Sequence, residues 1–449
     1  MGEMLLMPRR SVYFVSLGCP KNLVDTEFML GLLSRECFTI VSEVGKAQVA
    51  VINTCAFIRP AVEESIEVIL ELAEHKKRGH LERLYVTGCF VQRYGAKLRR
   101  ELPEVDGWLG TGEFHRIADI LKHEKSNAVP FQIGRPLYLA DHETPRFRTT
   151  PFYTAYLKIA EGCSNRCSYC TIPTLRGPYR SRSMDSLMIE AQRMAEKGVK
   201  ELNLIAQDTT LYGRDLEESV TIEDLLEKLL DIEELQWIRI LYSYPTRISE
   251  RLLKLIAQEE RICPYLDIPL QHVNENILKF MGRSAGMETP RQLIQRVRSL
   301  SRKLSLRTTI MVGFPGETDA AFEELYQFIR MAEFDYLGTF IFSPEKGTPA
   351  ARLGSVVDAE VALRRRDDIM ALQSQISMKR NGAMVGKVLP VLIEGLSPQT
   401  DLLLKGRTAD MAPDVDIEVL INKGDAQKGE IVPVLIKEAH AYELVGEIV

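Results

Sequence analysis

The chain has 449 residues, of which 45% are hydrophobic and 27% are charged, and its formal net charge is -5. This composition excludes a disordered or fibrous protein, and the length corresponds to about three globular domains. The net negative charge excludes a general attraction to phosphate backbones, so any binding of nucleic acid would have to be local.

The first unit, residues 1–145, alternates short apolar runs rich in Val, Ile or Tyr with helical patterns. The predicted strands lie at 12–17, 49–52 and 84–87, and the predicted helices at 23–35 and 61–77. This alternation predicts a doubly wound α/β domain. A polar, proline-containing stretch at 141–152 reads as the linker to the next unit.

A cysteine follows each predicted strand of the first unit, namely Cys19, Cys55 and Cys89. Because the carboxyl ends of parallel strands share one edge of a sheet, the three thiols are expected to converge there despite gaps of more than 30 residues. They therefore read as metal ligands. The alternative is three buried thiols, although burial alone would not explain the repeated strand-end position. Cys37 and Cys263 have no such setting and are predicted to be buried thiols.

The second unit, residues 146–380, contains a compact cysteine trio directly after its first predicted strand. Cys163, Cys167 and Cys170 stand in EGCSNRCSYC with C-x3-C-x2-C spacing. Three thiolates can hold three corners of a four-iron cluster, which leaves one iron open to a substrate or cofactor. Zinc is the alternative, but structural zinc normally has four protein ligands, and no fourth Cys or His lies within about 20 residues of Cys170. The spacing favours an iron–sulfur cluster.

The same unit repeats a strand and helix pattern. Predicted strands lie at 154–160, 201–206, 237–242, 265–268, 306–312 and 337–342, and predicted helices at 185–197, 222–231, 248–258, 290–304 and 318–332. Six consecutive strands separated by helices predict a partial (β/α) barrel with its chemistry at the carboxyl ends of the strands. An amphipathic helix at 358–380 connects this barrel to the tail.

The third unit, residues 381–449, consists mainly of short alternating strands. It predicts a small five-stranded antiparallel β-barrel of the oligonucleotide-binding type. With six basic and eleven acidic residues, this unit has a net charge of -5. Such a barrel repels a phosphate backbone and suits a basic protein surface, so nucleic acid is not expected to bind through it. The alternative is a solvated acidic face without a partner.

The sequence also bears on location. The amino-terminal stretch MGEMLLMPRR has an apolar run too short for a signal peptide, and no window approaches the 18 apolar residues of a membrane span. With most thiols assigned to metal, disulfides are not expected. We expect a cytoplasmic protein with no membrane contact.

The motif EGCSNRCSYC after a strand, followed by strand and helix repeats, resembles the radical S-adenosylmethionine superfamily. With Cys19, Cys55 and Cys89 ahead of it and a TRAM-type barrel behind, the chain is similar end to end to the methylthiotransferases. SLGCPKNLVDTE, NTCAFI, IAQDTTLYG, DIPLQH and TTIMVGFPGET most resemble the branch that acts on small-subunit ribosomal protein twelve. The sister branch, which modifies isopentenylated adenosine in transfer RNA, usually carries GCQ-x-N, whereas Pro20 and Lys21 follow Cys19 here.

The resemblance implies β-methylthiolation of an aspartate with two 4Fe-4S clusters and two S-adenosylmethionine molecules. The cluster of the compact trio would cleave S-adenosylmethionine to a 5'-deoxyadenosyl radical that abstracts hydrogen from the β carbon, and the cluster of the dispersed trio would supply sulfur. Implied partners are the ribosomal protein, free or in the assembled small subunit, and an electron donor such as flavodoxin or ferredoxin. Two alternatives stay open: a transfer RNA (isopentenyl-adenosine) methylthiotransferase, and a non-catalytic metal module that docks on the ribosome.

Five further residues are predicted to contact S-adenosylmethionine: three match positions near the cofactor in the superfamily, and two are glycines that let the backbone approach a ligand closely. They are Tyr169, Gln207, Asp208, Gly313 and Gly316. Their alternatives are a packing aromatic, hydrogen bonds to loop amides, and an ordinary glycine turn. Lys158 and Glu161 flank the cluster loop and could pair with the cofactor's charges. His272 is expected to be a hydrogen-bonded core or strand-top histidine rather than a ligand.

Overall fold

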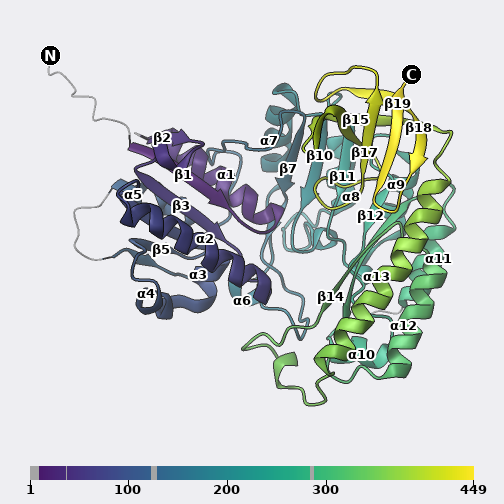
Figure 1. Ribbon diagram of the computed structural model, residues 1–449, viewed down its shortest axis with the longest axis horizontal. Coiled ribbons are helices and arrows are strands. Elements are labelled where there is room, and N and C mark those ends of the chain that lie inside the picture. Colours follow the sequence, from purple (N-terminus) through teal and green to yellow (C-terminus); the bar gives the residue numbers. More distant parts are fainter. Residues whose placement is uncertain (1–9, 37, 123–128, 284–287) are drawn as a thin grey trace.

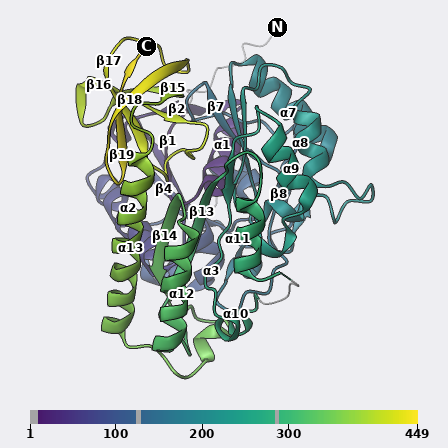
Figure 2. The same ribbon diagram turned by 90° about the vertical axis from the view of Figure 1, so that its right-hand side faces the viewer.

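The computed structural model describes residues 10–36, 38–122, 129–283 and 288–449. Residues 1–9, which make up most of the stretch MGEMLLMPRR, lie outside these ranges. Cys37 also lies outside them. Figures 1 and 2 show an amino-terminal sheet domain in purple and blue, a central barrel in teal and green, and a small yellow barrel at the carboxyl end. None of the described helices has the length and apolarity needed to cross a membrane.

The amino-terminal domain contains a six-stranded sheet in which every pair of neighbours is parallel. In spatial order its strands are β2 (Phe38–Val41), β1 (Arg10–Ser16), β3 (Val49–Thr54), β4 (Arg83–Gly88), β5 (Gly107–Leu109) and β6 (Phe131–Gln132). The strand order reverses between β1 and β3. Such a reversal opens a crevice at the carboxyl ends of the two strands, which is where ligands bind in open parallel sheets.

Helices cover both faces of this sheet, as predicted for a doubly wound domain (Figure 1). One face packs against α1 (Pro20–Ser34) and α5 (Ile117–Lys122), and the other against α2 (Arg59–Lys77), α3 (Cys89–Tyr94) and α4 (Leu98–Glu101). Strand β3 is apolar on both sides: Val49 and Val51 join the first core, and Ala50 and Ile52 join the second. This two-sided burial explains the continuous apolar run in its sequence.

The central unit is the predicted partial barrel. Its six strands are β7 (Thr154–Lys158), β10 (Glu201–Ile205), β11 (Trp237–Ile240), β12 (Tyr265–Asp267), β13 (Ser305–Val312) and β14 (Tyr336–Ile341). They form two three-stranded parallel sheets, which an isolated bridge between Ile238 and Ile262 connects. A short hairpin, β8 (Ala160–Glu161) and β9 (Arg180–Ser181), brackets the compact cysteine loop together with helix α6 (Ile172–Arg176).

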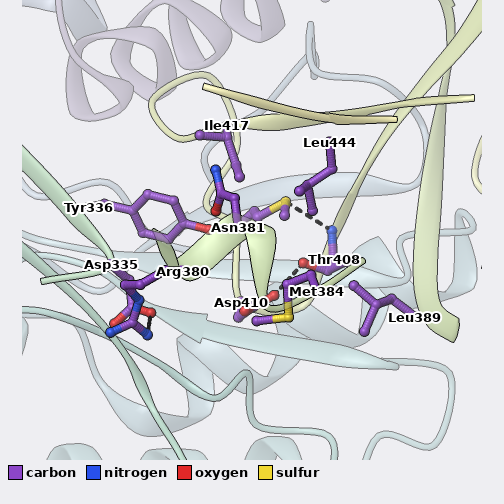
Figure 3. Close-up of a pocket in the computed structure, with 11 residues that line it drawn as sticks. Asp335, Tyr336, Arg380, Asn381, Met384, Leu389, Thr408, Asp410, Ile417 and Leu444 are labelled. Carbon is purple, nitrogen blue, oxygen red and sulfur yellow. Dashed lines mark hydrogen bonds and ion pairs between the residues drawn. The ribbon is translucent and has the colours of Figure 1, made fainter. Parts of the chain in front are cut away.

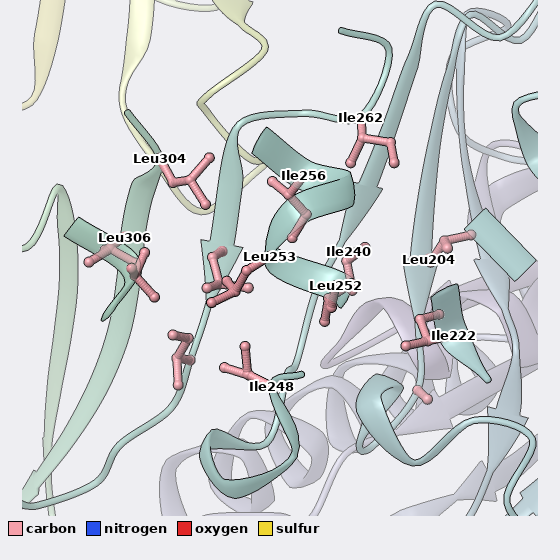
Figure 4. Close-up of a cluster of buried hydrophobic side chains, with 14 of the residues drawn as sticks. Leu204, Ile222, Ile240, Ile248, Leu252, Leu253, Ile256, Ile262, Leu304 and Leu306 are labelled. Carbon is pink, nitrogen blue, oxygen red and sulfur yellow. The ribbon is translucent and has the colours of Figure 1, made fainter. Parts of the chain in front are cut away.

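Helices surround the barrel: α7 (Met184–Glu196), α8 (Ile222–Leu229), α9 (Glu250–Gln258), α10 (Glu275–Phe280), α11 (Pro290–Arg298) and α12 (Asp319–Ala332). Helix α11 ends six residues before the predicted end because two serines follow, Ser299 at the C-cap and Ser301, and serine disfavours helix interiors. Figure 4 shows Leu204 and Ile240 of the strands and Leu252 and Ile256 of α9 among the side chains of the barrel core. Each fully buried side chain of this size stabilises the fold by about 1.5–3 kcal/mol.

Helix α13 (Ala359–Gly382) runs along the barrel to the tail. The tail closes into a barrel in the order β15 (Val388–Ser397), β16 (Thr400–Thr408), β17 (Glu418–Lys423), β19 (Glu443–Ile448) and β18 (Ile431–Ala439). Four neighbouring pairs are antiparallel as predicted, whereas β17 and β19 are parallel. Strand directions cannot alternate all the way around a closed ring of five, so at least one pair must be parallel.

Candidate active site

All six cysteines of the two trios line one cavity of about 440 Å³ between the amino-terminal sheet and the central barrel. Cys19 caps the start of α1, Cys55 follows β3, and Cys89 opens α3 directly after β4. The convergence predicted from their strand-end positions is therefore confirmed. All seven described cysteines are free thiols.

Gly18 permits the close approach of the first two thiols. Its φ is +89°, and a Cβ at this position would lie 2.7 Å from the Cys55 Cβ and 3.0 Å from the Cys55 Sγ. Asn22 stabilises the same part of the sheet edge. Its side-chain amide donates to the Leu17 carbonyl at 2.6 Å, and its backbone carbonyl accepts from the Asn53 side chain at 2.8 Å. The edge of the sheet thus holds Cys19 and Cys55 side by side.

The compact trio lies in the loop between β8 and α6, at the mouth of the barrel. The Ile172 backbone N–H donates to the Cys170 Sγ at 3.4 Å. Arg283 lies close to the Cys167 Sγ, with its Nη1 at 3.5 Å, and donates to the Pro269 carbonyl at 2.6 Å. These donors would stabilise thiolates over thiols.

Burial raises the pKa of Cys89 to about 11 and that of Cys170 to about 12, because both thiols are shielded from water. A metal that binds them displaces these protons. Among the described residues no three His, Cys, Asp or Glu side chains are placed to hold a single metal ion. Each thiolate of a four-iron cluster binds a different iron, so a cluster does not require three thiols around a single ion.

The lining that the structure describes contains no histidine and no seventh cysteine. Each trio would therefore leave a fourth iron without a protein ligand, as the spacing predicts. The donor set would thus fit one cluster for each trio.

Arg176 joins the two domains at the floor of the cavity, and sequence reasoning missed it. It is 2% exposed, forms an ion pair with Asp25 of α1, and donates to the Asn22 Oδ1 at 2.9 Å. Burial disfavours its charge, but the attraction of Cys89, Asp25 and Glu161 outweighs that cost and raises its pKa further. Its partners are about 150 residues away in the chain, so no local pattern could have indicated this role.

Lys158 and Glu161 belong to the same buried network. The Lys158 ammonium bonds to Asp25 and lies 2.7 Å from the Glu161 carboxylate. Burial disfavours the charge on Lys158, but attraction to these two carboxylates raises its pKa above the usual value. Both side chains are therefore engaged within the protein and link the cluster loop to α1.

The five predicted cofactor contacts fall into two groups. Tyr169 and Gln207 line the cavity. Asp208 is 1% exposed and does not line it; its carboxylate pairs with Arg247 at 2.6 Å and accepts from Asn165 at 2.8 Å. A contact between Asp208 and the cofactor stays a prediction.

Gly313 and Gly316 also lie outside the cavity lining. Gly313 has a φ of +72°, and a Cβ there would come within 2.8 Å of the Ala362 Cβ on α13. Its N–H donates to the Glu317 carboxylate at 2.9 Å. The close approach that requires glycine here is therefore to a helix of the protein, and the cofactor role of both glycines stays a prediction.

His272 is fully buried, and its Nδ1 accepts from the Asn274 N–H at 2.9 Å. Burial, and then the charge of Arg365, lower its pKa to about 3, so it is neutral. These contacts confirm a core histidine. Cys263, 1% exposed, is likewise a buried thiol as predicted.

Five further residues of the cavity wall stand out, and sequence reasoning gave none of them a role in binding. They are Lys21, Tyr242, Ser243, Gln271 and Arg283. Tyr242 and Gln271 have φ values of +63° and +70°, which are rare for residues with side chains. Backbone strain of this kind cannot be read from a sequence, and it concentrates at binding sites.

A smaller cavity of about 80 Å³ lies where α13 and β14 meet the tail barrel. Figure 3 shows Tyr336, Asn381, Met384 and Leu444 around it, with the hydrogen bond between Thr408 and Asp410 on one side. Its described lining holds no cysteine or histidine. This cavity lies at the joint between the two units.

Three family models match successive parts of the chain. The uncharacterized protein family UPF0004 matches residues 11–110, the radical SAM superfamily matches 157–329, and the TRAM domain matches 385–449.

Full-length relatives are also found. The chain is 48% identical over 442 residues to the ribosomal protein uS12 methylthiotransferase RimO of Syntrophotalea carbinolica. This alignment covers 98% of this chain and 97% of the relative. It is 46% identical to the protein of the same name from Geobacter sulfurreducens, over 98% of this chain and 99% of that one. Among solved structures, the radical S-adenosylmethionine methyltransferase TsrM from Kitasatospora setae superposes with a TM-score of 0.55 at 16% identity over 77% of each chain. This last likeness shows the fold alone.

Proposed function

The chain belongs to the ribosomal protein uS12 methylthiotransferases, and from this premise we propose that it attaches a methylthio group to the β carbon of an aspartate in ribosomal protein uS12. The resemblance drawn from the sequence motifs is confirmed by these relatives. The transfer RNA alternative is not favoured, because the uS12 relatives match from end to end.

One observation carries the proposal: two separate trios of thiols, on two different domains, line the same cavity. A reaction that joins sulfur to an unactivated carbon needs a source of radicals and a source of sulfur within reach of one substrate atom. A shared cavity provides that proximity. A metal site with a purely structural role would be closed by four protein ligands and would not need a second site opposite.

Cys163, Cys167 and Cys170 would hold the cluster that binds S-adenosylmethionine, and the dispersed trio would hold a second 4Fe-4S cluster. Bound there, the clusters and S-adenosylmethionine would supply the electron, the hydrogen-abstracting radical and the methylated sulfur. The protein's own residues hold the two domains in position and enclose the cavity between them. Arg176 and Lys158 fix the two domains against each other, and Tyr169 and Gln207 line the cavity. The network is buried, which excludes water from the floor of the site.

The tail barrel is proposed to recognise the substrate protein. Part of its acidic character is used internally, because Asp416 binds Tyr265 at 2.7 Å and Arg307 at 2.6 Å on the central barrel. Asp401 and Glu438 remain exposed. An acidic outer face favours a basic protein surface over RNA. We further propose a cytoplasmic location, a flavodoxin or ferredoxin as electron donor, and uS12 as substrate either free or in the assembled subunit.

The test is direct modification of purified uS12. The protein is reconstituted anaerobically with iron and sulfide, reduced, and incubated with S-adenosylmethionine and uS12. We expect about eight iron atoms per chain and a methylthio adduct on a single aspartate by mass spectrometry. About four iron atoms, or a fully loaded protein that leaves uS12 unmodified, would overturn the proposal. Tight, salt-dependent binding of transfer RNA by the same preparation would favour transfer RNA as the substrate.

A further inference from the structure

Lys21 brings a positive charge into the wall of the six-cysteine cavity. It is the second residue of α1, two positions after Cys19, and it lines the cavity while only 5% exposed. Its Nζ lies 3.2 Å from the centroid of the Tyr242 ring. The aromatic face holds the ammonium in place and offsets about 2 kcal/mol of its desolvation.

The ammonium has no anionic partner within the part of the chain that the structure describes. The groups that attract it have other roles: Cys19 belongs to the dispersed trio, Asp267 accepts from the Tyr242 N–H at 2.9 Å, and Glu161 bonds to Lys158 at 2.7 Å. A buried charge costs several kcal/mol unless it is paired, and one ring face does not repay that cost. An anion that enters the cavity would supply the missing partner.

The other cations of the cavity wall are already occupied. Arg176 is held by Asp25, and Arg283 donates to the Pro269 carbonyl at 2.6 Å. Within the described lining, Lys21 is therefore the cation whose N–H groups donate to no protein oxygen.

Two more polar atoms of the cavity wall lack partners. The Ser243 Oγ and the Gln271 Oε1 are buried, make no hydrogen bond within the described structure, and belong to residues that line the cavity. Ser243 directly follows Tyr242, whose φ of +63° reorients the chain at the end of its strand, and Gln271 has a φ of +70°. A buried polar atom without a partner costs about 1–3 kcal/mol. Together the wall offers a cation, a hydroxyl donor and an amide oxygen acceptor.

We propose that Lys21 binds the side-chain carboxylate of the substrate aspartate, with the Ser243 hydroxyl as a second donor and the Gln271 amide oxygen as acceptor for a peptide N–H. The inference rests on the proposed function and adds the origin of its specificity. The reacting β carbon is bonded to that carboxylate. Lys21 thus selects aspartate over neutral residues and anchors the β carbon in the cavity that both cysteine trios line.

The experiment measures the binding of uS12, and of a uS12 variant with Asn at the modified aspartate, to the anaerobically reconstituted protein. We expect the wild type to bind the aspartate form at least about 30-fold more tightly than the asparagine form, and Lys21→Met to reduce this ratio below about 3-fold. Lys21→Arg keeps the charge and should retain most of the ratio. Lys46→Met removes an exposed lysine that pairs with Glu43 at 2.6 Å and should match the wild type.

Ser243→Ala is a smaller change that keeps the test decisive if Lys21→Met does not fold, and it should reduce the ratio about 10-fold through loss of one charge-assisted hydrogen bond. A Lys21→Met protein that discriminates aspartate from asparagine as well as the wild type would overturn the inference. The inference would also be overturned if Lys21→Met lost iron from the dispersed trio and still preferred the aspartate form of uS12 as strongly as the wild type does. Lys21 would then pair with the cluster and not with the substrate. Failure of the proposed function gives a different result: a wild-type protein with a full load of iron leaves uS12 unmodified.

Discussion

Arg407 of the tail barrel and Glu201 of strand β10 form a buried ion pair with two contacts. The Arg407 Nη1 donates to the Glu201 Oε1 at 2.6 Å, its Nη2 contacts the other oxygen, and neither side chain is more than 3% exposed. Arg239 donates to the same carboxylate at 3.1 Å. Strand β10 leads to Gln207 at the cavity, so this pair connects the tail barrel to the central barrel.

Replacement of Arg407 by Met is predicted to destabilise the joint between the two barrels by about 3 kcal/mol, because Glu201 loses its main partner in a place that water cannot reach. Urea unfolding and the rate at which a protease releases the tail would measure this. Lys423→Met is the matched control. Lys423 is 75% exposed and lies 3.9 Å from Glu447, so its loss should change stability by less than about 0.5 kcal/mol. Equal effects of the two changes would show that the buried pair does not hold the tail.

The Glu201 carboxylate should make the free energy of unfolding depend on pH. Burial raises the pKa of Glu201, but Arg407 and then Arg239 outweigh burial and lower it from 4.5 to about 2. Because the pKa of Glu201 is lower in the folded state, its carboxylate contributes fully to the free energy of unfolding above about pH 4.5. This contribution is lost as the pH falls toward 2. The total is about 3 kcal/mol. The free energies of unfolding of the wild type and of Glu201→Gln should therefore converge between about pH 5 and about pH 2, and parallel curves would contradict this.

The sequence was most informative where chemistry follows a regular element. Cys19, Cys55 and Cys89 each come after a strand, and parallel strands deliver their ends to one edge, so their convergence could be predicted without knowing any contact. Gly313 shows the limit of such reasoning. Its need for glycine was evident, but whether a ligand or Ala362 fills the space depends on the position of α13, about 50 residues later.

The contacts that join the domains could not be predicted. Arg176 pairs with Asp25, and Arg407 with Glu201, across 151 and 206 residues of chain. Charged residues of this kind are mostly solvated at protein surfaces, and only the packing of the three units buries these. Lys21 was noted for its place in a motif, but its lack of an anionic partner among the described residues is a property of the folded cavity.

The two trios should fail in different ways when single cysteines are replaced. Ala at Cys163, Cys167 or Cys170 is predicted to abolish the formation of 5'-deoxyadenosine, because the cluster that binds S-adenosylmethionine is lost. Ala at Cys19, Cys55 or Cys89 should leave formation of 5'-deoxyadenosine without any methylthiolated uS12. Chromatography of the nucleoside and mass spectrometry of uS12 measure the two outcomes. If both sets of variants lose cleavage of S-adenosylmethionine, the trios do not have separate roles.

Gly18→Ala should remove the dispersed cluster without replacing any of its cysteines. The added Cβ would lie 2.7 Å from the Cys55 Cβ, so Cys55 must move away from Cys19. We expect iron to fall from about eight atoms per chain to about four, with cleavage of S-adenosylmethionine retained. Gly79→Ala is the matched control, since Gly79 also has a positive φ, +77°, but no atom within 4 Å of the added Cβ. It should cost about 1 kcal/mol of stability from backbone strain and keep the full iron content. Retention of all the iron by Gly18→Ala would show that the two thiols do not need their close approach.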